Sequence, residues 1–157
     1  MRIVLQRVNR ACVAVDGEIV GSIQHGLLVL VGVAQGDTEN DARRLAQKCA
    51  EMRIFADEAG RFNRSLVDVR GEALVVSQFT LLADNRRGRR PNFASAAEPE
   101  VAERLIEAFS VAMLDAGVAV QTGRFGAKME VELVNDGPVT IVIDSVELDR
   151  PRSGNKL

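Results

Sequence analysis

"GLLVLVGV", residues 26 to 33, is the stretch that decides the fold. Its side chains are apolar at successive positions, so both faces of a strand built from it must be buried. A surface strand would instead alternate apolar and polar residues. The sequence therefore predicts a sheet that has this segment as a central strand.

The flanking segments extend the sheet on one side and begin a helix on the other. Alternation at Ile3 and Leu5 and again at Val13 and Val15 predicts a first strand, and Asp16-Gly17 followed by "EIVGSI" predicts a hairpin. From Asp37 onward apolar residues recur every three or four positions, with acidic residues crowded into the first turn. This pattern predicts an amphipathic helix over residues 38–53.

The second half of the chain repeats these signals in a different order. A strand is expected in "EALVVSQFTLL", residues 72–82, and a helix over residues 99–116 with Gly117 as its C-cap. Further strands are expected at residues 118–122, 128–134 and 139–146. We predict one α+β domain, residues 1–157, with two helices flanking a curved, barrel-like, mixed but mostly antiparallel sheet.

Composition narrows the possible classes of protein. The chain is 46% hydrophobic and 27% charged with a net charge of -2, as expected of a globular protein. It has no apolar run of about 18 residues, so we expect a cytoplasmic protein without a membrane partner. Two cysteines and a single histidine, His25, indicate neither a disulfide framework nor a zinc site, and no metal or cofactor is expected.

Four arginines stand in five positions within "RRGRR", residues 86–90. Clustered arginines on a weakly acidic protein are typical of a local phosphate contact. A solvated surface loop explains them equally well. The sequence leaves both interpretations open.

Polar residues interrupt the predicted strand at "SQFT", residues 77–80. In a buried strand each polar group needs a hydrogen-bond partner or serves a ligand. The strand could distort here and free backbone N–H groups to hold an oxyanion. Alternatively, the hydroxyls merely satisfy a strand end.

Another break falls in "VELVNDGPVTIVID", residues 131–144. Pro138 has no backbone N–H for a sheet ladder, so a turn between two strands is the simplest interpretation of Gly137-Pro138. An X–Pro bond of this kind is cis in only about 5% of cases.

Five segments together resemble the D-aminoacyl-tRNA deacylases, in order and over essentially the whole chain. They are "MRIVLQRV" at the start, "RIFADEAGRFNRS" at 53–65, "SQFTL" at 77–81, "GRRPNF" at 88–93 and "GRFGAKMEVELVNDGPVT" at 123–140. "SQFTL" and "NDGPVT" are the two signature segments of that family.

The resemblance implies an editing hydrolase that cleaves the ester between a D-amino acid and the 3′ end of tRNA. It also implies removal of glycine mischarged onto alanine tRNA, without a cofactor. The implied assembly is a homodimer with active sites at the subunit interface. In the family the bond matching Gly137-Pro138 is cis and reaches into the pocket of the other subunit, where it rejects L-amino acids.

The resemblance also assigns roles to residues. It places the chemistry at Ser77, Gln78, Phe79 and Thr80. Substrate binding and rejection of L-amino acids fall to Gly137, Pro138, Phe125, Ala127, Met129 and Arg7. Arg7 is expected to brace the Gly-Pro motif, although simple packing also explains Arg7, Phe125 and Met129.

Two mechanisms are compatible with these residues. Thr80 could act as a nucleophile, but the sequence shows no obvious base to activate it. The second mechanism, favoured by the resemblance, uses backbone N–H groups at residues 77–80 and the 2′-OH of the terminal ribose to assist water. Two other functions remain as alternatives, a non-catalytic RNA-binding module and a metal-independent esterase of small D-amino acid esters.

Overall fold

A computed structural model describes residues 1–150, so the last seven residues of the domain predicted over 1–157 lie outside the described residues. The strands in chain order are β1 (Arg2–Val15), β2 (Glu18–Ile23), β3 (Gly26–Gly32), β4 (Phe55–Ala56), β5 (Phe62–Arg64), β6 (Glu72–Ser77), β7 (Ala119–Thr122) and β8 (Glu130–Asp144). The helices are α1 (Glu39–Glu51) and α2 (Pro99–Asp115), with short 3-10 turns η1 (Phe79–Leu82) and η2 (Ser145–Glu147).

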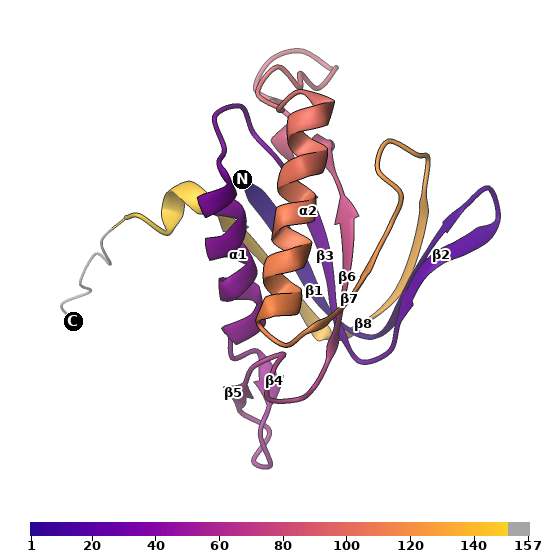
Figure 1. The fold of residues 1–157 in the computed structure, drawn as a ribbon, viewed down its shortest axis with the longest axis vertical. Coiled ribbons are helices and arrows are strands. Elements are labelled where there is room, and N and C mark those ends of the chain that lie inside the picture. The colour runs from indigo at the N-terminus through magenta and orange to yellow at the C-terminus, as the bar shows by residue number, and fades with distance from the viewer. Residues whose placement is uncertain (151–157) are drawn as a thin grey trace.

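The segment at residues 26–33 forms the central strand, as predicted. The main sheet has the order β2-β1-β3-β6-β7, and β8 pairs with β1. The β3–β6 and β6–β7 pairs are parallel, whereas β1 pairs antiparallel with β2, β3 and β8. The α+β fold with a mixed, mostly antiparallel sheet and two helices is therefore confirmed (Figure 1).

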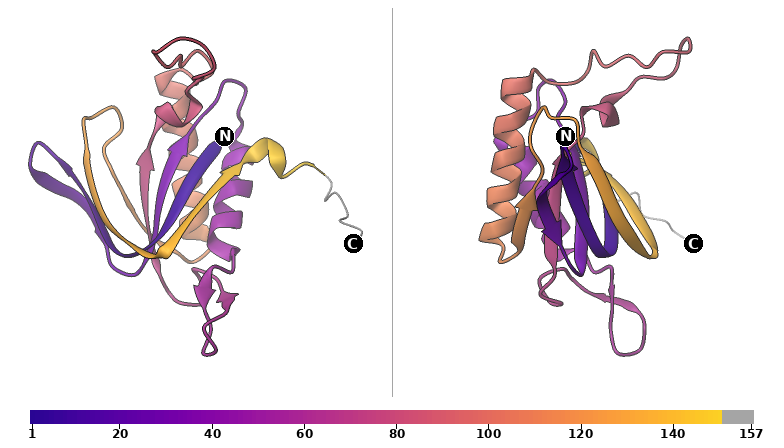
Figure 2. Two further views of the ribbon diagram at one scale, coloured as in Figure 1. Left: turned by 180° about the vertical axis from the view of Figure 1, so that it is seen from behind. Right: turned by 90° about the vertical axis from the view of Figure 1, so that its right-hand side faces the viewer.

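The sheet curves strongly, so that it is barrel-like (Figure 2). Along one edge β1 pairs with β3 through residues 2–8 and with β2 through residues 11–15. The curvature brings β2 close to β7. A Cβ placed on Gly21 would lie only 2.7 Å from the carbonyl oxygen of Thr122. A glycine is thus required where the two strands approach.

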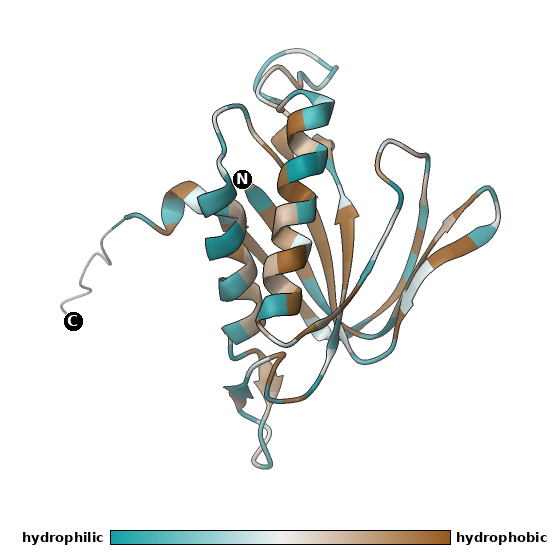
Figure 3. Cartoon of the chain, viewed as in Figure 1, coloured by the Kyte–Doolittle hydropathy of each residue, from teal (hydrophilic) through white to brown (hydrophobic). Residues whose placement is uncertain are grey.

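Both helices cover one face of this sheet (Figure 1). α1 begins with a capping box in which Thr38 and Asp41 bond to each other's backbone N–H. Apolar residues of both helices face the strands, while hydrophilic residues line the outer side (Figure 3). α2 ends at Asp115 with Ala116 as its C-cap, and Gly117, predicted as the C-cap, lies one residue later with φ +89°.

β3 is buried on both faces because it separates two apolar clusters. Leu27, Val29 and Val31 point into the cluster beneath the helices. Leu28 belongs to the second cluster, inside the curve of the sheet, together with Leu74. This alternation is what an uninterrupted apolar strand produces.

The structure corrects two expectations. The strand expected over 72–82 ends at Ser77 and is followed by η1, because Gln78 (φ -147°, ψ 78°) leaves the strand conformation. The strands expected at 128–134 and 139–146 form one element, β8, and both halves pair with β1. Gly137-Pro138 is therefore an interruption of one ladder and not a turn between two strands.

Within residues 1–150, neither helix has the length and apolarity needed to cross a lipid bilayer.

Candidate active site

A pocket of about 510 Å³ lies where β3 and β6 reach their C-terminal ends. Its walls come from five parts of the chain. They are residues of β3 (Val31) and Val33, the end of β6 with its extension (Val76, Ser77, Gln78, Phe79), the approach to α2 and its first turns (Ala96, Ala97, Pro99, Ala102, Ile106), the segment before β8 (Phe125, Gly126, Ala127, Met129) and β8 itself (Val131).

Three residues of the predicted "SQFT" segment, Ser77, Gln78 and Phe79, form one edge of this pocket. Ser77 is the last residue of β6 and pairs with Val31, and the backbone N–H of Gln78 donates to the carbonyl oxygen of Val31 at 2.8 Å. The chain then turns into η1, packed closely on β3. A Cβ on Gly32 would lie 3.0 Å from the carbonyl oxygen of Gln78.

Two backbone N–H groups at this turn are free to bind an anion. The first N–H groups of a helical turn have no partner inside it. The N–H of Gln78 is already used by Val31, whereas the N–H groups of Phe79 and Thr80 have no acceptor among residues 1–150. Phe79 lines the pocket, and an unpaired N–H beside an apolar cavity is an element of an oxyanion site.

The side chain of Thr80 is placed differently from its neighbours. It is exposed and does not line the pocket. Its hydroxyl oxygen accepts a hydrogen bond from the side-chain amide of Gln78. Ser77, Gln78 and Phe79 do line the pocket.

The three predicted lining residues before β8 come together with the "SQFT" segment. Phe125, Ala127 and Met129 are half-buried and line the same pocket. They follow β7 in a turn in which the N–H of Ala127 donates to the carbonyl oxygen of Arg124 at 3.2 Å, and Gly126 has φ +73°.

Arg7 lies elsewhere, in the middle of β1, and only 8% of its surface is exposed. Its Nη1 donates to the carbonyl oxygen of Ile54 at 2.6 Å, and its Nε lies 3.0 Å from Oδ2 of Asp136. The guanidinium also lies over the ring of Phe62, 5.3 Å from the centroid. Arg7 thus joins the residue preceding Gly137 to the loop before β4.

Gly137 and Pro138 are exposed, and the peptide bond between them is cis. They do not line the pocket. The reason is that the two segments align with different positions of β3. Arg7, which lies next to Gly137, pairs with Leu27, whereas Ser77 pairs with Val31. Four residues of strand separate these positions by about 13 Å along β3 alone. One chain therefore does not bring the two signature segments together.

Sequence reasoning missed two contributions. The first turns of α2 line the pocket through Ala102 and Ile106, positions whose helical spacing indicates only core packing. Asn135 was also missed, although its side chain bridges the ladder interruption in β8. An asparagine immediately before "DGP" was the available signal, because its amide can replace missing backbone bonds.

A curved mixed sheet backed by two helices, with a pocket where "SQFT" ends β6, matches a known family of hydrolases. The family model described as D-Tyr-tRNA(Tyr) deacylase matches residues 4–144. The chain belongs to this family.

Individual relatives agree over nearly the full length. A D-aminoacyl-tRNA deacylase of Roseiflexus castenholzii is 60% identical over 153 residues, which are 98% of each chain. One from a Geobacillus species is 54% identical over 156 residues, 99% of this chain and 100% of the relative.

Among solved structures, the c-Myc DNA Unwinding Element Binding Protein is 37% identical, with a TM-score of 0.85 over 92% of this chain and 98% of that one. A probable eukaryotic D-amino acid tRNA deacylase has a TM-score of 0.79 over 90% of this chain and 97% of that one, at 18% identity. This second likeness concerns the fold alone.

Proposed function

We propose that the protein hydrolyses the ester joining a D-amino acid to the 3′ end of tRNA, and that it also releases glycine mischarged onto alanine tRNA. The observation that carries the proposal is the pocket edged by Ser77, Gln78 and Phe79 in a chain 60% identical to a D-aminoacyl-tRNA deacylase. A tRNA substrate is consistent with the predicted cytoplasmic location.

The proposed chemistry uses backbone donors. The free N–H groups of Phe79 and Thr80 would hold the oxyanion that forms when water attacks the ester carbonyl. The Thr80 hydroxyl, which already accepts a hydrogen bond from the Gln78 amide, is not the nucleophile in this proposal. His25, the sole histidine of the chain, precedes β3 at the end opposite the pocket. The terminal ribose 2′-OH, adjacent to the scissile ester, is the group left to assist the water.

Stereochemical selection is assigned to the backbone of Gly137 and Pro138. A rigid wall close to one face of the substrate Cα excludes an L side chain but admits a hydrogen atom. A wall made of backbone does not read side-chain chemistry, so it would accept many D-amino acids. Glycine has no side chain to reject and would pass.

This wall is remote from the pocket of its own chain, so the proposal includes a homodimer in which it serves the pocket of the second copy. Two observations support the assembly. β8 pairs only with β1, which leaves the second edge of a 15-residue strand without a partner among residues 1–150. Val142 on this strand is 60% exposed. Long unpaired edges are typical sites of chain association.

One assay tests the function. Enzyme treated with a chelator is incubated with D-aminoacyl-tRNA, L-aminoacyl-tRNA, glycyl-tRNA(Ala) and a D-amino acid methyl ester. Release from the D-aminoacyl and glycyl substrates alone supports the proposal. Binding of tRNA without release would indicate an RNA-binding module, and equal turnover of the methyl ester would indicate a small-ester esterase.

The assembly and the ribose role have tests of their own. Light scattering coupled to size exclusion should give twice the 17.0 kDa mass of the chain. A tRNA ending in 2′-deoxyadenosine should bind but react slowly. A monomeric mass at all concentrations, or normal turnover of the deoxy substrate, would refute the corresponding part of the proposal.

A further inference from the structure

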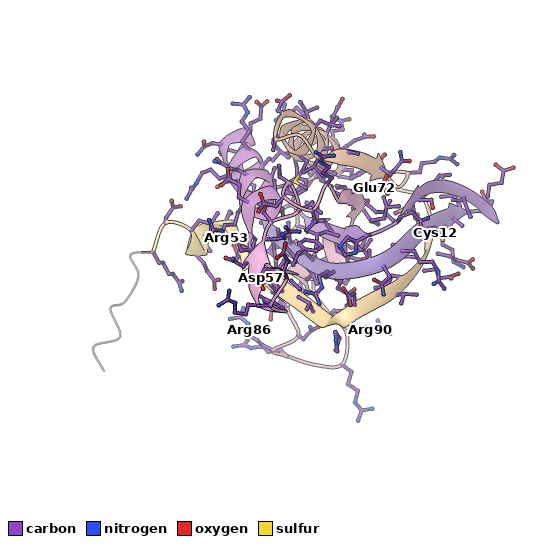
Figure 4. All side chains as sticks on the ribbon, turned by 90° about the horizontal axis from the view of Figure 1, so that it is seen from below. Cys12, Arg53, Asp57, Glu72, Arg86 and Arg90 are labelled. Carbon is purple, nitrogen blue, oxygen red and sulfur yellow. The ribbon has the colours of Figure 1, made fainter. Side chains whose placement is uncertain are left out.

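The arginine loop, residues 84–92, lies between η1 and α2. It contains Arg86, Arg87, Arg89 and Arg90, all of them exposed. The loop extends from the body on the side away from the helices, as the right-hand view of Figure 2 and the view of Figure 4, with Arg86 and Arg90 labelled, both show.

The base of the arginine loop is held by backbone bonds. The N–H of Asp84 donates to the carbonyl oxygen of Asn92 at 2.7 Å, and the reverse bond measures 3.0 Å. The following segment is fixed as well, because the N–H of Ala97 donates to the carbonyl oxygen of Val33 at 2.9 Å. The arginines therefore project from a defined position.

Only one of the four arginines is neutralised by a neighbour. Arg86 donates to both carboxylate oxygens of Asp84, at 2.8 and 2.7 Å. Among residues 1–150, Arg87, Arg89 and Arg90 have no ion-pair partner. Three uncompensated guanidinium groups thus stand close together on a chain whose net charge is -2.

The arginine loop adjoins the mouth of the pocket. Phe93, the residue that follows the loop, packs edge-on against Phe79 with ring centroids 5.1 Å apart. Phe79 lines the pocket and is 58% exposed. Ala96 and Ala97, a few residues further on, line the same pocket. A chain that enters the pocket by its end would pass beside the arginines.

We propose that the arginine loop binds backbone phosphates of the RNA strand whose 3′ end occupies the pocket. This inference rests on the proposed tRNA substrate. Guanidinium groups bind phosphate oxygens through two parallel hydrogen bonds. Such contacts position an RNA without reading its sequence, which suits an enzyme that acts on many tRNAs.

Binding of uncharged tRNA tests the loop independently of catalysis. The variant Arg87→Ala/Arg89→Ala/Arg90→Ala is compared with Arg43→Ala/Lys48→Ala/Arg104→Ala, which removes the same charge from exposed positions on the helices. Fluorescence anisotropy is recorded over a range of salt concentrations. The loop variant should bind at least about tenfold more weakly at low salt. Its plot of log K against log salt should be less steep by about 2, because three arginines are lost and each phosphate contact contributes ~0.7 on a single strand. The helix variant should match the wild type.

A variant with the opposite effect sharpens this test. Asp84→Asn removes the carboxylate that neutralises Arg86 but keeps the backbone bonds at the base of the loop. The salt slope should become steeper, because a fourth arginine is released. A slope equal to that of the wild type in both loop variants would overturn the proposal and leave the arginines as a solvated surface.

Hydrolysis separates phosphate binding from an effect on pocket shape. The substrates are D-aminoacyl-tRNA and 3′-(D-aminoacyl)adenosine, which lacks phosphodiesters. The triple loop variant should lose kcat/KM on the tRNA alone. Equal losses on both substrates would show that the loop shapes the pocket and would overturn the proposal. If the wild type hydrolyses neither substrate, the proposed function fails, while the anisotropy measurement still decides the role of the loop.

Discussion

The side-chain Oδ1 of Asn135 accepts a hydrogen bond of 2.9 Å from the backbone N–H of Val139, four residues further along β8. This bond spans the ladder interruption at residues 136–139, where Pro138 has no N–H to offer. The amide of Asn135 also donates to the carbonyl oxygen of Val139 at 3.3 Å. One side chain therefore takes the place of the missing ladder bonds and closes the segment that presents Gly137-Pro138.

The first prediction follows from this closure. Asn135→Ala leaves the N–H of Val139 without its acceptor in a half-buried setting, so the free energy of unfolding should fall by about 1–2 kcal/mol. Asn135→Asp retains the acceptor and should lose less. Urea denaturation measures both, with Asn85→Ala at an exposed position as control. A loss no larger than that of Asn85→Ala would contradict the assigned role.

The second prediction concerns Gly137, which has φ +126°. A Cβ there would lie 2.8 Å from Cγ2 of Val139 and 3.2 Å from Nη2 of Arg7. Gly137→Ala should therefore displace the wall and lower the ratio of D- to L-aminoacyl-tRNA hydrolysis, or abolish substrate binding. Gly60→Ala is the matched control, because Gly60 has φ +75° but nothing within 4 Å of the added Cβ. An unchanged ratio with normal binding in Gly137→Ala would remove the wall from the mechanism.

The third prediction separates the ring of Phe79 from its backbone N–H. Phe79 is the first residue of η1, a position where proline fits. Phe79→Ala removes the ring alone, whereas Phe79→Pro removes the ring and the N–H. If this N–H holds the oxyanion, kcat should be lower in the proline variant than in the alanine variant by roughly 10²–10³-fold. Equal kcat values, with matching circular dichroism spectra, would exclude the Phe79 N–H as a catalytic donor.

The fourth prediction distinguishes the two mechanisms at Thr80. Its hydroxyl is exposed and accepts from the Gln78 amide, and no basic side chain is hydrogen-bonded to it among residues 1–150. Thr80→Ala retains the backbone N–H and should therefore keep much of the wild-type kcat. Single-turnover hydrolysis of D-aminoacyl-tRNA measures the effect. Near-complete loss in a folded protein would favour a threonine nucleophile instead.

The sequence predicted those parts of the fold that depend on local pattern. The segment at 26–33 is apolar on both faces, and apolar residues recur at helical spacing from Asp37. In both cases the local pattern alone predicts which side chains are buried. Where a segment's structure depends on a distant partner, local pattern was insufficient. The strand expected over residues 72–82 stops at Ser77, because Gln78 leaves the strand conformation and η1 packs on Gly32, a contact that links segments far apart in the sequence.

The candidate site likewise contains some residues that the sequence predicted and others that it did not. Resemblance led to Phe125, Ala127 and Met129, which do line one pocket with Ser77, Gln78 and Phe79. The α2 residues of that pocket were not predicted, because a small or apolar residue on a helix stripe serves a core and a cavity wall equally well. Gly137-Pro138 carries a recognisable signature, but its distance from the pocket follows from strand register, which depends on the pairing of β1 with both β3 and β8.

The last prediction uses the two free thiols. Cys49 on α1 is completely buried, and desolvation raises the pKa of its thiol well above the ordinary value. Because the thiolate is the reactive form, Cys49 should resist iodoacetamide in the native protein, whereas half-buried Cys12 should be modified first.

A thiol whose pKa is higher in the folded state stabilises the fold fully below its unfolded pKa, about 8.5, and this contribution falls as pH rises further. Mass spectrometry of the Cys12→Ala variant measures the Cys49 rate between pH 7 and about 10, and urea denaturation of the same variant should show stability falling over the upper part of that range. Alkylation of Cys49 as fast as in the urea-unfolded chain would contradict its burial beneath the helices.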